Sequence, residues 1–139
     1  MDILVTGPRG ADLDVGLTAY TMLAVKSFAR QLDINRLRTV IKIRLHNALT
    51  VDRGSSEGLC ESIDPRHFII DVAMYGNWLS TLAHEMVHVK QFAKGELDAG
   101  LTRWKSNKYC DKIDYWDQPW EKEARKLQHK MTERFCEEG

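Results

Sequence analysis

The hydrophobic and polar positions of this chain change their period along its length, and each period predicts a different element. From Leu13 to Leu32 apolar residues recur every three or four positions, which predicts an amphipathic helix. Over Leu37–His46 apolar and basic residues largely alternate, which predicts a half-buried strand with a basic outer face. The first third of the chain therefore predicts a helix followed by a strand.

The middle of the chain contains signals for two further strands. The stretch "DRGSSEG" (52–58) predicts a loop or hairpin turn, and a short strand is expected over Leu59–Ser62. After the break at Asp64-Pro65, "HFIIDVA" (67–73) is rich in β-branched and aromatic residues, and predicts a strand covered on both faces.

The last half of the chain predicts two helices joined by a polar stretch. Gly76-Asn77 provides a break and an N-cap for a helix from Trp78 to about Lys94, which Gly95 closes. The segment "LTRWKSNKY" (101–109) has only a weak extended pattern. Pro119 belongs in the first turn of a final helix that reaches about Phe135, with Asp117 as its expected cap.

These elements predict one α+β domain over residues 1–139, with a small antiparallel sheet of about three strands. The helix over 13–32 comes first, and the sheet precedes the helix over 78–94 and the final helix. The sequence contains no internal repeat, low-complexity tract or linker.

Composition narrows the classes of function. Twenty basic and twenty acidic residues balance to a net charge of zero, which argues against a protein that mainly neutralises nucleic-acid phosphates. The sequence shows no secretory signal, and no apolar run approaches the roughly 20 residues that span a bilayer. Cys60, Cys110 and Cys136 are far apart and in no CxxC spacing, which is typical of reduced thiols in a cytoplasmic protein.

The clearest chemical signal is "HEMVH", which places His84 and His88 four residues apart with Glu85 after the first histidine. Four residues is about one helical turn, so the two imidazoles project side by side and can bind one Zn²⁺. Glu85 can then reach a metal-bound water without ligating the metal, which is the logic of an H-E-x-x-H motif. The surrounding helix is largely apolar, so these polar groups need a partner, and a metal is the simplest one.

A catalytic zinc usually has three protein ligands, and the residues leave more than one candidate for the third ligand. The metzincin pattern is excluded because Gln91 and Lys94 stand where it requires glycine and histidine. His129 is expected either at the surface or in contact with a metal ligand without binding the metal itself. Glu121 and Glu123 point in opposite directions on a helix, so only one can face the metal. The alternative interpretation is that both simply stabilise the helix N-terminus electrostatically.

Three segments together, "HEMVHVKQFAKGEL", "RWKSNKY" and "YWDQPWEKEA", resemble small HExxH zinc metallopeptidases of the gluzincin type. The likeness is to phage-type and SprT-like metallopeptidase domains and, more distantly, to the ImmA/IrrE group. It implies a minimal zincin-like fold, with Glu121 as the third ligand and Glu123 in a supporting salt bridge or hydrogen bond. The chain departs from the SprT-like pattern, which has a third histidine soon after the pair, and DNA association is not implied.

The expected function is therefore zinc-dependent hydrolysis of a peptide or protein substrate, with Glu85 as general base. Candidates for stabilising the oxyanion are Tyr115, then Tyr109 and His129, each of which has packing or surface placement as the simpler interpretation. The alternatives are a zinc-binding regulatory or scaffold domain without turnover, and an interaction module without a metal.

Expectations for the surroundings of the centre are less specific. The substrate groove is expected at the sheet edge beside 67–73, with Trp104 and Trp120 lining it or bracing the helices. Asp71 or Asp98 is expected to hold the second nitrogen of a ligand histidine. The sequence specifies neither the cleavage preference nor the oligomeric state.

Overall fold

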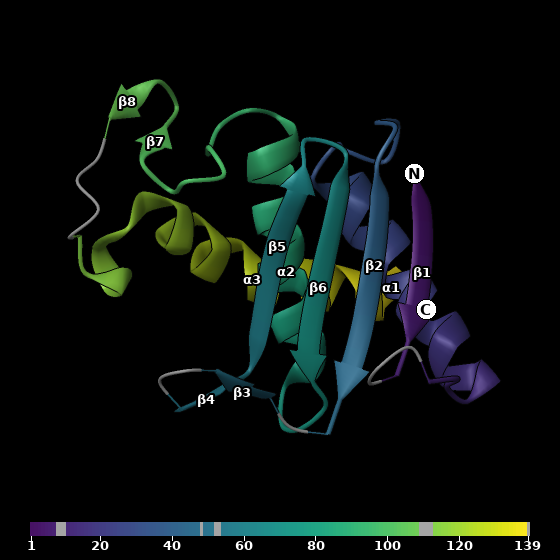
Figure 1. Cartoon of the computed structure of the whole chain (residues 1–139). Coiled ribbons are helices and arrows are strands. Elements are labelled where there is room, and N and C mark those ends of the chain that lie inside the picture. The colour runs from purple at the N-terminus through teal and green to yellow at the C-terminus, as the bar shows by residue number, and fades with distance from the viewer. Residues whose placement is uncertain (8–10, 48, 52–53, 109–112, 139) are drawn as a thin grey trace.

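A four-stranded sheet has three helices on one side in the computed structural model, which describes residues 1–7, 11–47, 49–51, 54–108 and 113–138 (Figure 1). The elements in chain order are β1 (Asp2–Thr6), α1 (Val15–Gln31), β2 (Val40–His46), β3 (Leu49–Val51), β4 (Gly54–Ser56), β5 (Gly58–Asp64), β6 (His67–Ala73), α2 (Trp78–Ala93), β7 (Arg103–Trp104), β8 (Asn107–Lys108) and α3 (Pro119–Glu138). A 3-10 turn, Tyr115–Asp117, immediately precedes α3. The mixed helix and strand content agrees with the expected class.

The main sheet has the strand order β1-β2-β6-β5. β1 pairs with β2 and β2 pairs with β6 in parallel, whereas β5 is antiparallel to β6. β3 and β4 form one small hairpin and β7 and β8 another, in the regions where a turn and a weak extended segment were expected. The centre of the first hairpin, residues 52–53, lies outside the described residues.

The prediction of an antiparallel sheet of about three strands is wrong, because β1 was missed and two of the three pairings are parallel. β1 has only five residues. Leu4 is 54% exposed and its neighbour Val5 is buried, yet both are apolar, so the sequence of this strand does not alternate between apolar and polar residues. With β1 in place, α1 is the crossover between two parallel strands rather than an isolated N-terminal helix.

The two central strands of the main sheet, β2 and β6, bury one face each. Ile41, Ile43 and Leu45 of β2 are buried as predicted. In β6, Phe68, Ile70 and Val72 are buried, but Ile69 and Asp71 on the other face are only half-buried. The expectation that β6 is covered on both faces is therefore wrong, because all three helices lie on the same side of the sheet (Figure 1).

The ends of α2 match the sequence signals closely. Gly95 has a φ of +72°, and its N–H bonds to the Phe92 carbonyl while that of Glu96 bonds to the Gln91 carbonyl. This is the Schellman arrangement, in which glycine tolerates the left-handed backbone at low cost. Asn77 lies at the N-cap position but makes no side-chain cap bond.

The expected cap of α3 is wrong. Asp117 belongs to the 3-10 turn, and the Gln118 carbonyl accepts the first bonds of the helix, from the N–H groups of Glu121 and Lys122. Proline at position 119 favours an extended backbone at Gln118. Gln118 rather than Asp117 is therefore the residue that caps the helix.

Within the described residues, no helix is long and apolar enough to cross a membrane.

On the open face of the sheet, Asp71 binds two side chains of β2. Nε and Nη2 of Arg44 donate to its two carboxylate oxygens at 2.7 and 2.9 Å, and Nε2 of His46 lies 2.7 Å from Oδ1. Burial raises the pKa of Asp71, but the hydrogen bonds from Arg44 and His46 outweigh burial and hold the pKa below its usual value.

Because the pKa of Asp71 is lower in the folded chain than in the unfolded one, its ionised form stabilises the fold. This contribution is present above the unfolded pKa of about 4 and is lost as the pH falls through the folded value. We expect the loss in unfolding free energy caused by Asp71→Asn to be large at pH 7 and to shrink below about pH 4. Urea unfolding over this pH range measures it, with Asp12→Asn at an exposed position as the control. A loss that does not change with pH would contradict the assignment.

Candidate metal centre

Two histidines of α2 project toward α3 from the same helix face. His84 and His88 are one turn apart, and their ring centroids are 5.0 Å apart at an interplanar angle of 76°. The helix is part of the core, with Leu82, Ala83, Met86, Val87 and Val89 all buried. The core packing of α2 therefore fixes the backbone from which both imidazoles project.

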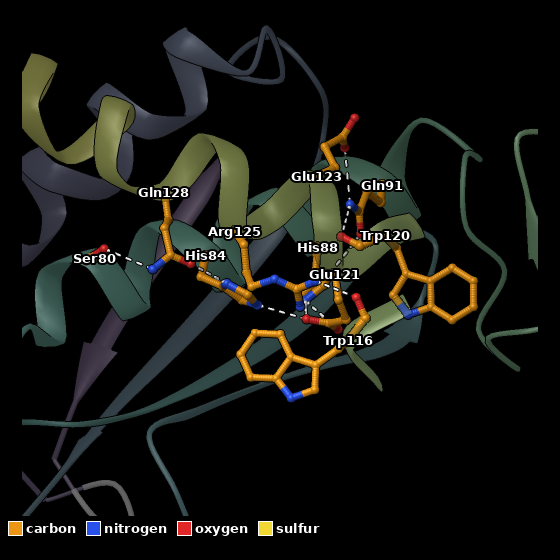
Figure 2. Close-up of polar contacts among 10 residues, drawn as sticks. All are labelled: Ser80, His84, His88, Gln91, Trp116, Trp120, Glu121, Glu123, Arg125 and Gln128. Carbon is orange, nitrogen blue, oxygen red and sulfur yellow. Dashed lines mark hydrogen bonds and ion pairs between the residues drawn. The ribbon is translucent and has the colours of Figure 1, made fainter. Parts of the chain in front are cut away.

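Glu121, from the first turn of α3, meets both imidazoles. Nε2 of His84 lies 2.9 Å from Glu121 Oε1, and Nε2 of His88 lies 3.1 Å from Glu121 Oε2 (Figure 2). Glu121 is 8% exposed, so this carboxylate is held in the interior between the two helices. The three side chains converge through the atoms that commonly ligate metals.

Glu85 adds a second carboxylate. It is 5% exposed, and the potential ligand atoms of His84, Glu85 and His88 all lie within 4.8 Å of one another. This group can hold a metal ion. The centre thus combines two imidazoles with one carboxylate from the same helix and one from α3.

The other ring nitrogen of each histidine is held by a glutamine (Figure 2). Nδ1 of His84 lies 2.6 Å from Gln128 Oε1, and Nδ1 of His88 lies 2.8 Å from Gln91 Oε1. Since an amide oxygen only accepts hydrogen bonds, it fixes a proton on Nδ1 and orients the ring so that Nε2 faces Glu121.

The prediction that Asp71 or Asp98 fills this role is wrong. Asp71 binds Arg44 and His46 on the open face of the sheet, and Asp98 accepts bonds from Thr102 and from the Arg103 N–H. The signal for the glutamines was their helical spacing. Gln128 follows Glu121 by seven residues and so lies on the same face of α3, and Gln91 is three residues after His88.

The charges within the centre stabilise one another. Burial lowers the pKa of His88, but its hydrogen bond to Glu121 and the charges of Glu85 and Glu121 raise it to about 9. Burial also lowers the pKa of His84, but its hydrogen bond to Glu121 and the charge of Glu85 raise that pKa above its usual value. Burial raises the pKa of Glu121, yet its bonds to both histidines hold the pKa well below its usual value.

Glu85 behaves differently from Glu121. Burial raises the pKa of Glu85 above its usual value, and the charges of His88 and His84 only partly oppose this. The two carboxylates of one centre are thus shifted in opposite directions, because Glu121 is hydrogen-bonded to both imidazoles while the dominant effect on Glu85 is desolvation.

Glu123 points away from the imidazoles and ties the helices together. Its Oε1 accepts from Lys90 Nζ at 2.9 Å and from Gln91 Nε2 at 3.1 Å. Gln91 Nε2 also lies 2.9 Å from the Trp120 carbonyl. Of the two acidic residues proposed for the third position, Glu121 is therefore the one beside the imidazoles, and Glu123 supports the contact between α2 and α3.

The centre opens into a cleft bordered by β5. Gly58, Leu59 and Cys60 line a cavity of about 330 Å³ together with the residues of the centre. β5 is the edge strand next to β6, so the cleft lies at the sheet edge where the groove was expected. Trp120 lines the cleft and also packs against Trp104, with ring centroids 6.4 Å apart.

Of the proposed oxyanion stabilisers, Tyr115 lies at the cleft. Burial raises its pKa well above the usual value, with the charge of Glu121 adding to the shift. Arg125 holds this turn, since its guanidinium lies 4.5 Å from the Trp116 ring centroid and Nη2 donates to the Trp116 carbonyl at 2.7 Å (Figure 2). His129 is exposed, with its Nδ1 3.3 Å from Ser80 Oγ, and Tyr109 lies outside the described residues.

The role of Gln128 in orienting His84 can be tested with methionine, which has a similar volume and no amide oxygen. If the centre holds a divalent metal ion, we expect Gln128→Met to weaken its binding by about 10- to 100-fold, as is common when a metal-binding histidine loses its hydrogen-bond partner. Competition with a chromogenic chelator measures the affinity. Gln31→Met is the matched control, because Gln31 links α1 to α3 through Ser27 and the Met131 carbonyl, away from the centre. Equal effects of the two changes would contradict the role.

Comparisons with known proteins leave the function to be argued from this geometry. No protein-family model, curated protein or solved structure matches the chain.

Proposed function

We propose that this chain is a zinc-dependent metallopeptidase. The observation that carries the proposal is the convergence of His84 Nε2 and His88 Nε2 on the Glu121 carboxylate, beside buried Glu85 and at an open cleft. Catalytic zinc sites typically have three protein ligands and a position open to water. The resemblance noted from the sequence supports the same assignment.

The donor set fits zinc. His84, His88 and Glu121 would hold the ion with two nitrogen donors and one oxygen donor, a combination that zinc accepts in hydrolytic enzymes. When bound, zinc supplies a Lewis acid that polarises a water and lowers its pKa to about 7. Glutamine partners on both Nδ1 atoms favour this role, because they orient the rings and make them better ligands.

Glu85 is proposed as the general base. It takes a proton from the water that attacks the peptide carbonyl and passes the proton to the leaving amine. Its burial favours this step, since a desolvated carboxylate is a stronger base than an exposed one. Tyr115 is proposed to donate its hydroxyl hydrogen to the oxyanion, because it lines the same cleft.

The partner is proposed to be an extended peptide or an exposed protein segment. Within the part of the chain that the structure describes, β5 is the outermost strand of the main sheet, and its backbone after Gly58 is proposed to pair with an added strand. The cytoplasmic setting is also a proposal and depends on the three widely spaced cysteines.

Replacing Glu85 with glutamine tests catalysis separately from metal binding. We expect Glu85→Gln to retain zinc and to lose peptide cleavage by at least about 100-fold, because the amide cannot accept the proton. Elemental analysis and turnover of a peptide mixture measure the two properties. A variant that cleaves like the parent would remove Glu85 from the mechanism, and a parent that binds zinc without cleaving any peptide would favour a zinc-binding domain without turnover.

The choice of third ligand is tested by comparing two neighbouring glutamates on α3. We expect Glu121→Ala to weaken zinc binding by more than the 10- to 100-fold typical of losing a ligand's hydrogen-bond partner. Glu123→Ala removes the tie to Lys90 and Gln91 and should have a smaller effect. Chelator competition on both variants measures this, and the reverse order would make Glu123 the ligand.

A further inference from the structure

The cleft consists of two lobes that share the reactive centre. One cavity of about 330 Å³ and another of about 310 Å³ are both lined by Gly58, His84, Glu85 and Tyr115. Each volume lies at the lower end of the roughly 300–1,000 Å³ typical of small ligand sites. Each lobe therefore has room for one side chain of a bound peptide rather than for a folded surface.

The first lobe is mostly apolar. Beyond the centre, its walls come from β5, α2, the segment after α2 and the start of α3, and comprise Leu59, Cys60, Phe92, Leu97, Leu101 and Trp120. Phe92 lies one helical turn after His88 and so continues the same face of α2. Apolar surface thus begins directly beside the ligand residues.

The second lobe is polar and acidic. Apart from the shared residues, it is lined by Glu57, Thr81 and Gln128. Glu57 is exposed and directly precedes β5, while Glu85 provides a second carboxylate at the boundary with the first lobe. A cationic or neutral polar side chain suits this lobe, whereas an acidic one would be repelled by the Glu57 carboxylate, which remains when Glu85 is replaced.

Leu101, in the wall of the apolar lobe, has an unusual backbone conformation. It has a φ of +58° and is 43% exposed. A residue other than glycine, asparagine or aspartate is uncommon in this region, because the conformation is strained for a residue with a Cβ atom. An exposed leucine held in this conformation is an apolar group placed at the mouth of the lobe.

We propose that the two lobes select the residues on either side of the cleaved bond, with a bulky apolar side chain in one and a basic or neutral polar side chain in the other. This inference rests on the proposed peptidase function. An extended peptide points successive side chains to opposite sides, so a carbonyl held at the shared residues directs its two neighbours into different lobes. The substrate class is thus a peptide with one bulky apolar residue and one basic or neutral polar residue flanking the cleaved bond.

Binding can be measured without turnover by using the Glu85→Gln variant loaded with zinc. The probes are short fluorescent peptides with the central pairs Phe-Lys, Lys-Phe, Phe-Glu, Glu-Phe and Ala-Ala. We expect one of the two Phe/Lys orders to bind about tenfold or more tightly than Ala-Ala, because a large apolar side chain is buried. Replacing Lys by Glu in that peptide should weaken binding about two- to fivefold.

Two further changes, made in the same background, assign each preference to its lobe. Leu101→Asn should reduce the preference for Phe while the fold is kept, because asparagine tolerates a positive φ, and Leu101→Met is the apolar control. Glu57→Lys should remove the preference for Lys over Glu. Glu61→Lys is the matched control, because it makes the same charge change on β5 and lines neither lobe.

The outcomes separate this inference from the proposed function. Equal binding of all five peptides, or preferences unchanged by both Leu101→Asn and Glu57→Lys, would overturn the two-lobe assignment. Selective binding together with no cleavage of any peptide by the unmodified chain would keep the assignment and overturn the peptidase function. Cleavage of all five peptides at the same rate would keep the peptidase function and overturn the assignment.

Discussion

A single buried amide sets the relation between the two helices on which the centre depends. Gln91 is fully buried, and its side chain reaches His88 through Oε1 and both the Trp120 carbonyl and Glu123 through Nε2. A buried amide is costly unless its donors and acceptor are satisfied, so these bonds favour one register of α3 against α2. In that register the residue next to Trp120, Glu121, is directed at the two imidazoles.

The sheet contributes by bringing its edge strand close to α2. A Cβ atom added at Gly58 would lie 2.7 Å from Thr81 Cγ2 and 3.2 Å from Glu85 Cγ, so any larger residue at this point of β5 would displace these side chains. The close approach lets one strand border both lobes of the cleft beside Glu85. Helix packing thus brings His84, His88 and Glu121 together, and strand placement forms the space in front of them.

Local patterns predicted the parts of the fold and site that depend on neighbouring residues. The extent of α2 followed from Gly76-Asn77 and Gly95, and the pairing of His84 with His88 followed from one helical turn. The parallel position of β1 could not be predicted in this way, because its partner β2 is about forty residues away and packing rather than periodicity selects it.

The same limit applies to the site. Whether Glu121 or Glu123 faces the histidines depends on the rotation of α3, which is set by tertiary contacts such as those of Gln91. Gln128 approaches His84 for the same reason, from forty-four residues along the chain. The sequence could identify the chemical groups of the centre, but only their packing shows which of them meet.

The metal content of the chain tests the central claim most directly. Protein purified without chelators and analysed for elements is expected to contain about one zinc per chain, and a His88→Ala variant prepared in parallel should contain far less. Absence of zinc from the unmodified chain under every loading condition would contradict the metal centre and the hydrolytic function built on it.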